Sequence, residues 1–92
     1  MADNTQRITK MTELLQAALS PEYLHIVDDS HLHVGHPGAK SGGGHFTVFI
    51  TAKAFNDKTA ILRHKLVYTA LASMMQHDIH ALSIHAKPTN TA

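Results

Sequence analysis

Histidine is the residue type that sets this sequence apart, with nine copies in 92 residues. An imidazole can ligate a metal ion when it is neutral and can carry a positive charge near neutral pH. The chain has no cysteine, which excludes disulfides, thiolate metal sites and cysteine nucleophiles. Any metal that this chain holds by itself must therefore be bound through histidine or carboxylate side chains.

Three of the histidines lie in one glycine-rich segment. Residues 28–44 contain all five glycines of the chain, together with His31, His33 and His36. Imidazoles on such a segment can pivot to meet a metal, but glycine makes the segment costly to order. We therefore expect it to bind a ligand only where a second surface helps. The alternative is a solvated loop with no binding role.

His80 stands in a different setting, at the start of an alternating run that is typical of a strand. Its spacing places it in phase with Leu82 and Ile84, so we expect it to share their face of the sheet. A single histidine in that position is more often structural than a ligand. The pattern alone leaves both interpretations open.

The charge balance argues against strong binding to nucleic acid. Eight Lys and Arg against seven Asp and Glu give a net charge of +1, short of the basic excess that phosphate binding usually needs. The basic triplet Arg63-His64-Lys65 is more typical of a solvated helix face. No GxSxG turn is present, and the glycines at 42–44 precede a strand and not a helix. We do not expect an enzyme.

Apolar periodicity predicts the elements that position these residues. The first helix should end at Ser20 because Pro21 cannot continue it, and Asp3 with Gln6 resembles a capping box. Thr59 is a plausible N-cap for a long helix. The predicted elements are a helix over residues 3–19, strands over 23–27 and 45–51, a short segment over 52–55, a helix over 59–77 and a strand over 79–86. The buried residues predicted for the two helices are Ile8, Met11, Leu14, Leu15, Ala18 and Leu19, and Leu62, Leu66, Val67, Ala70, Leu71, Met74 and Met75.

This order predicts an α+β domain with a three-stranded mixed sheet and helices packed on one face. The last two strands are joined through a helix, which favours a parallel pair, and the first two are most simply antiparallel. We expect one domain over residues 1–92, with an ordered core at about 4–87, a flexible His/Gly loop at 28–44 and a polar tail at 88–92. The absence of an apolar signal core and of an apolar run near ~18 residues predicts a cytoplasmic protein without membrane contact.

Several fragments together resemble the BolA family in one register over about residues 8–88. They are Ser30-His31-Leu32-His33, Gly44-His45-Phe46, Phe55, Arg63-His64-Lys65-Leu66-Val67-Tyr68 with Ala70-Leu71, and Ile79-His80-Ala81-Leu82-Ser83-Ile84. The resemblance implies a class II KH-like domain with the element order αββααβ. That order agrees with the one predicted from periodicity.

The resemblance also implies a function. BolA proteins bind monothiol glutaredoxins and share a bridging [2Fe-2S] cluster with the glutaredoxin and glutathione, and some bacterial members regulate transcription of stress and morphology genes. The histidine of the family's His-Ala-Leu motif falls on His80, and its variable loop ligand falls on His33, with His31 and His36 close enough to substitute. The isolated chain is expected to bind no cluster and to be a monomer or a weak homodimer.

Two departures from the family pattern bear on the choice between these functions. Asp57 stands where the family usually has glycine in Phe-x-Gly-Lys, and Lys65 replaces an arginine. Both changes disfavour close approach to phosphate. We therefore expect an iron–sulfur adaptor, with a DNA-binding regulator as the alternative. Weak DNA binding would depend on Arg63, Lys65, Lys58 and Lys87.

Overall fold

The computed structural model describes residues 4–30 and 43–89. Asp3 of the expected capping box and the loop histidines His31, His33 and His36 lie outside the described residues. The elements in chain order are α1 (Asn4–Leu19), β1 (Tyr23–Asp28), β2 (Gly44–Thr51), the 3-10 turn η3 (Lys53–Phe55), α2 (Ala60–Ala70), the 3-10 turn η4 (Ala72–Met74) and β3 (Ile79–Lys87).

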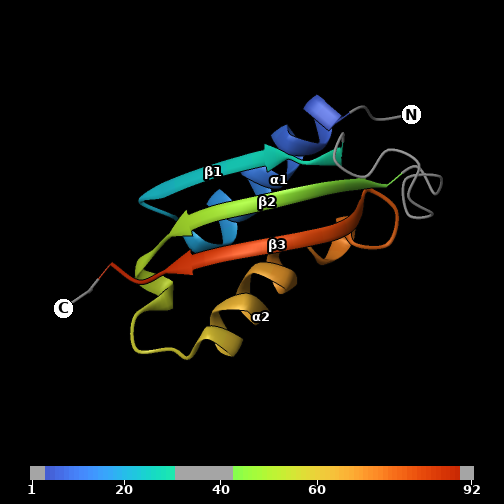
Figure 1. Ribbon diagram of the computed structural model, residues 1–92. Coiled ribbons are helices and arrows are strands. Elements are labelled where there is room, and N and C mark those ends of the chain that lie inside the picture. The colour runs from blue at the N-terminus through green and yellow to red at the C-terminus, as the bar shows by residue number, and fades with distance from the viewer. Residues whose placement is uncertain (1–3, 31–42, 90–92) are drawn as a thin grey trace.

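The three strands form one mixed sheet in the order β1-β2-β3. β1 pairs antiparallel with β2, and β3 pairs parallel with β2, as predicted from the helix that joins the last two strands and from the simplest arrangement of the first two. Figure 1 shows α1 and α2 together on one side of this sheet. The predicted α+β architecture is therefore confirmed. Neither of the helices described here has the length and apolar character needed to cross a membrane.

The first helix packs on the sheet through residues spaced four apart. Met11, Leu15 and Leu19 are buried, because side chains at this spacing fall on one face of a helix. Ala18, which we expected to be buried, is exposed because its position turns it away from that face. Ser20 ends the helix in the left-handed region with φ 45, directly before Pro21. The proline signal therefore located the end of α1 correctly.

The second helix contacts the core through a narrower stripe than periodicity predicted. Val67 is fully buried, and Leu66 and Ala70 pack beside it. Leu62 is 46% exposed, so its predicted burial is wrong. At about 3.6 residues per turn, a residue five positions before Val67 lies well over a quarter turn around the helix from it. This geometry turns Leu62 away from the sheet.

The α-helix also ends earlier than predicted, at Ala70 and not near His77. Leu71 leaves the helical conformation with φ −100 and ψ 10, and the Met74 N–H donates to the Leu71 carbonyl at 2.9 Å. The tighter turn buries both Leu71 and Met74. It also turns the chain toward the start of β3, which a repeating apolar pattern cannot reveal.

Thr59 is the N-cap of α2, as its position predicted, and its hydroxyl oxygen accepts from the Leu62 N–H at 3.3 Å. We expect Thr59→Ala to lower the free energy of unfolding by about 1 kcal/mol, because an N–H at the helix start then loses its partner. Urea denaturation followed by far-UV circular dichroism measures this change. Thr59→Ser keeps the hydroxyl and should retain most of the stability. Equal losses in the two variants would contradict the capping role.

Candidate functional site

His80 occupies an irregular position at the start of β3. Gly44 pairs with Ile79, but the next residue of β2, His45, pairs with Ala81. His80 is therefore an extra residue on β3 that has no pairing partner on β2. Such a β-bulge re-aims the side chains around it, and bulges are frequent beside functional sites.

The bulge changes the face to which His80 belongs. Ile79 is buried, His80 and Ala81 are both exposed, and Leu82 returns to the half-buried face. Our expectation that His80 shares the face of Leu82 and Ile84 is therefore wrong. The extra residue shifts the alternation by one position and leaves His80 accessible at the end of a strand that the core holds in place.

The described residues on either side of the segment that carries the loop histidines, Ser30 and Gly43, contact His45 and His80 respectively. At its start, the Ser30 hydroxyl accepts from the His45 N–H at 3.0 Å. At its end, a Cβ added to Gly43 would lie only 3.0 Å from the His80 Cβ, so the backbone there passes directly against His80. The Gly44 N–H donates to the Asp78 carbonyl at 3.0 Å and holds this approach. The described residues that flank positions 31–42 therefore lie at the neighbouring His45 and His80.

A second histidine, which the sequence analysis did not assign to the site, lies next to His80. The rings of His45 and His80 have centroids 5.1 Å apart and are tilted by 48°. His45 is only 4% exposed, so it forms the inner wall of the site while His80 forms its accessible part. The neighbouring Gly42–Gly44 run marked a loop end, but it is the parallel pairing of β2 with β3 that brings residues 45 and 80 together.

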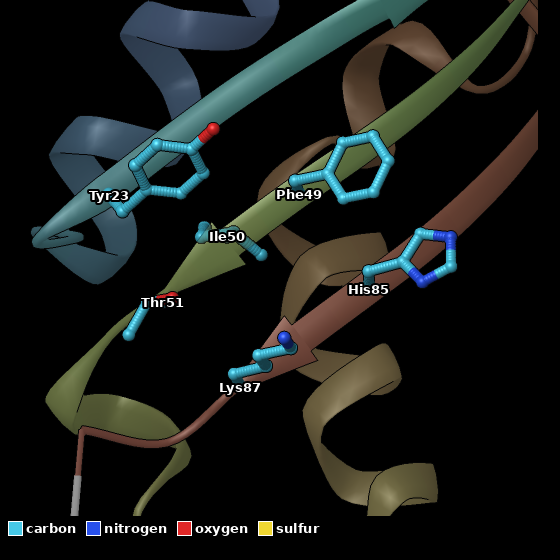
Figure 2. A pocket seen from close by; sticks show the side chains of 6 residues that line it. All are labelled: Tyr23, Phe49, Ile50, Thr51, His85 and Lys87. Carbon is cyan, nitrogen blue, oxygen red and sulfur yellow. The ribbon is translucent and has the colours of Figure 1, made fainter.

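The residues of the alternative nucleic-acid site do not gather on one surface. Arg63 Nε donates to the Lys58 carbonyl at 3.0 Å, and its Nη1 donates to the Ala86 carbonyl at 3.3 Å. Its guanidinium therefore ties α2 to the preceding loop and to β3. Lys65 is exposed on α2, whereas Lys87 lies on the opposite face of the sheet, where Figure 2 shows its side chain in front of the strands.

The loop before α2 explains one departure from the family pattern. Asp57 has φ 62, in the left-handed region that glycine adopts most easily. The Asn56 side chain accepts from the Thr89 N–H at 2.8 Å, which ties this loop to the end of β3. At Asp57 the loop thus has a left-handed backbone conformation that suits glycine, but the side chain there is a carboxylate. A negative charge at this point disfavours an approaching phosphate.

Across residues 4–30 and 43–89, no group of three or more His, Asp or Glu side chains is arranged to hold a metal ion. The described site therefore offers one accessible imidazole with a buried imidazole beside it. Such a site can complete a metal centre whose other ligands come from elsewhere.

Comparison with known proteins places this arrangement in a family. The family model for BolA-like protein matches residues 15–91. The chain is 40% identical over 84 residues to the chloroplastic protein BOLA1 of Arabidopsis thaliana, covering 88% of this chain and 52% of that protein. It is 33% identical over 76 residues to the DNA-binding transcriptional regulator BolA of Escherichia coli, covering 83% of this chain and 70% of the regulator.

Two solved structures from Arabidopsis thaliana share the fold. The BolA domain of SufE1 superposes with a TM-score of 0.79 at 35% identity, covering 90% of this chain and 92% of the domain. BolA1 gives a TM-score of 0.79 at 33% identity, covering 100% of this chain and 99% of that structure. The chain spans about half the length of the full BOLA1 protein and 22% of the SufE-like protein that it also matches. The chain belongs to the BolA-like family.

Proposed function

We propose that this chain is an adaptor that binds a monothiol glutaredoxin and supplies a histidine ligand to a [2Fe-2S] cluster shared by the two proteins. The observation that supports this most directly is the bulge that exposes His80 at the start of β3. A ligand on a strand anchored by the core loses little conformational freedom when it binds. His80 is therefore suited to be the constant ligand.

The composition determines what each partner must contribute. This chain has no cysteine, so it can offer only imidazole nitrogen, and the thiolates must come from the glutaredoxin and glutathione. Histidine in place of thiolate raises the reduction potential of a [2Fe-2S] centre. A cluster shared in this way would be easier to reduce than one held by thiolates alone, which suits trafficking of clusters or regulation by iron.

The second ligand from this chain comes from residues 31–42 in this proposal. His33 is the first choice, and His31 and His36 can replace it. Support comes from the placement of Ser30 against His45 and of Gly43 against His80, the two neighbouring histidines of the site. The rings on this segment must be ordered when they bind, at a cost of roughly 1–2 kcal/mol per residue fixed. His33→Ala should therefore weaken or alter the cluster spectrum without removing it.

Anaerobic mixing with a monothiol glutaredoxin loaded with glutathione and cluster tests the proposal. We expect the visible circular dichroism of the glutaredoxin cluster to change as this chain is added, and iron to elute with a complex of both proteins in size-exclusion chromatography. The chain alone, treated with the same iron and sulfide, is the control and should remain colourless. An unchanged spectrum together with separate elution of the two proteins would contradict the proposal.

DNA binding remains a second candidate because the Escherichia coli relative bears the name of a DNA-binding transcriptional regulator. In this chain, Arg63 is engaged by two backbone carbonyls and Lys87 lies away from α2. Few phosphate contacts remain, so duplex binding through Lys58 and Lys65 would be weak and sensitive to salt.

A further inference from the structure

The sheet has one face that the helices do not cover. α1 and α2 both lie behind the strands, and the other face is open along its length in the described part of the chain (Figure 1). Alternate residues of each strand point to this open face, since successive side chains of a strand point to opposite sides. They are Tyr23, His25 and Val27 from β1, Thr47, Phe49 and Thr51 from β2, and Ser83, His85 and Lys87 from β3.

A row of flat rings crosses the open face, one from each strand. His25 and Phe49 stack with centroids 6.1 Å apart and planes at 28°. Phe49 and His85 stack at 4.7 Å and 8°. Strand pairing maintains the row, because Phe49 is the register partner of both histidines. The three rings form a platform that no other described element covers.

A shallow pocket of about 130 Å³ opens beside this row (Figure 2). A buried cavity of about 150 Å³ holds a benzene molecule, so the pocket is close to the size of one aromatic ring. Figure 2 shows the Tyr23 ring on one side of it, the Phe49 and His85 rings on the other, and Lys87 at the end of the sheet. The residues that line it are Tyr23, Phe49, Ile50, Thr51, His85 and Lys87.

The lining determines the charge of a suitable ligand. Aromatic pockets often bind cations, but Lys87 would repel a cation here, and none of the lining residues is acidic. Asp29 lies at the other end of the face, where its carboxylate accepts from the Thr47 hydroxyl. The pocket therefore suits a flat ring that carries negative charge close by, which is the chemistry of a nucleobase attached to phosphate.

We propose that this open face binds single-stranded nucleic acid, with one base in the pocket against Phe49 and His85 and a backbone phosphate at Lys87. One stacked base and one ammonium group are too little to hold a free nucleotide firmly against the entropy lost on association. The ring row continues past the pocket to His25, where a neighbouring base of the same strand can stack. Bases in a duplex are already stacked and do not offer their faces.

This site is separate from the one around His80. The pocket lies where β2 and β3 end, at Thr51 and Lys87, whereas His80 lies where β3 begins. The site also differs from the basic residues of α2, because Lys65 and the open face lie on opposite sides of the sheet. The proposal of nucleic-acid binding at the open face can therefore hold or fail independently of cluster binding at His80.

Fluorescence anisotropy with a labelled eight-residue oligouridine or oligothymidine tests the proposal at low salt. We expect Phe49→Leu, which keeps apolar bulk but loses the stacking ring, to weaken binding about fivefold or more. Lys87→Gln should weaken it about two- to fivefold and reduce its salt dependence by about one phosphate contact. Lys10→Gln removes an equal charge from an exposed position of α1, on the other side of the sheet, and should leave the affinity unchanged.

Circular dichroism must show that each variant is folded, and His85→Ala provides a second variant of the platform because its exposed side chain contributes little to the core. A blunt duplex of the same length and free uridine monophosphate should both bind at least tenfold more weakly than the single strand. The proposal is overturned if the duplex or the free nucleotide binds as well as the single strand. It is also overturned if Phe49→Leu and His85→Ala both leave binding unchanged, or if Lys10→Gln weakens it as much as Lys87→Gln.

Discussion

His80→Ala is expected to abolish the cluster spectrum of the mixed complex with glutaredoxin, while the two apo proteins still associate. The substitution removes the accessible imidazole at the bulge, and the buried position of His45 prevents that ring from taking its place without a backbone shift. Visible circular dichroism of the anaerobic mixture measures the cluster, and size-exclusion chromatography measures association. The fold should be unaffected, since His80 is exposed.

His85→Ala is the matched control, because His85 is an exposed histidine on the same strand at its far end. This variant should give the spectrum of the original chain. An unchanged spectrum in His80→Ala, with the fold intact, would show that His80 is a structural residue of the strand edge. Loss of the spectrum in both variants would indicate that β3 is disturbed and not that a ligand is lost. That result would also contradict the assignment of His80 as the ligand.

Phe55→Ala is expected to have the largest effect on stability, about 3–5 kcal/mol. Phe55 is fully buried in η3, where it fills the space between the sheet and the helices. Removal of the ring leaves a cavity, because the neighbouring side chains are close-packed and cannot move far enough to fill the space. Domains of this size are commonly stable by only about 5–15 kcal/mol, so the variant should be partly unfolded at 37 °C.

Urea denaturation followed by far-UV circular dichroism measures the loss, and two controls define its cause. Phe55→Leu keeps most of the apolar volume and should lose much less. Ile61→Ala removes a large apolar side chain that is 73% exposed, and should change the free energy of unfolding by less than about 0.5 kcal/mol. Equal losses for Phe55→Ala and Ile61→Ala would contradict the packing described for the core.

The architecture could be predicted from the sequence because local signals agreed with one another. Pro21 ended the first helix, the alternation through Phe46, Val48 and Ile50 marked a strand, and the helix between the last two strands favoured a parallel pair. Tertiary packing decided what these signals could not. The end of α2 at Ala70 depends on how the chain must turn to begin β3, and no proline or glycine marks that turn.

The site was predictable in part for a similar reason. His80 could be chosen from a motif, but its exposure depends on a bulge between two strands that are distant in the sequence. The contact between His45 and His80 could not be predicted either, because it depends on the register in which β2 pairs with β3. Arg63 was chosen for its charge, and only the positions of the Lys58 and Ala86 carbonyls show that it stabilises the fold.

The contacts from α2 to β3 have a consequence for the solubility of the protein. The Lys87 carbonyl accepts from the Ala52 N–H and so points to the β2 side of β3. Successive carbonyls of a strand point in opposite directions, so those of Leu82 and Ala86 point to the outer edge of the sheet. Tyr68 and Arg63 donate to these two carbonyls. An uncovered edge strand is a template for intermolecular β-sheet growth, and occupied acceptors deny an incoming strand its hydrogen bonds. The side chains that join helix to strand thus also protect the folded chain from aggregation along β3.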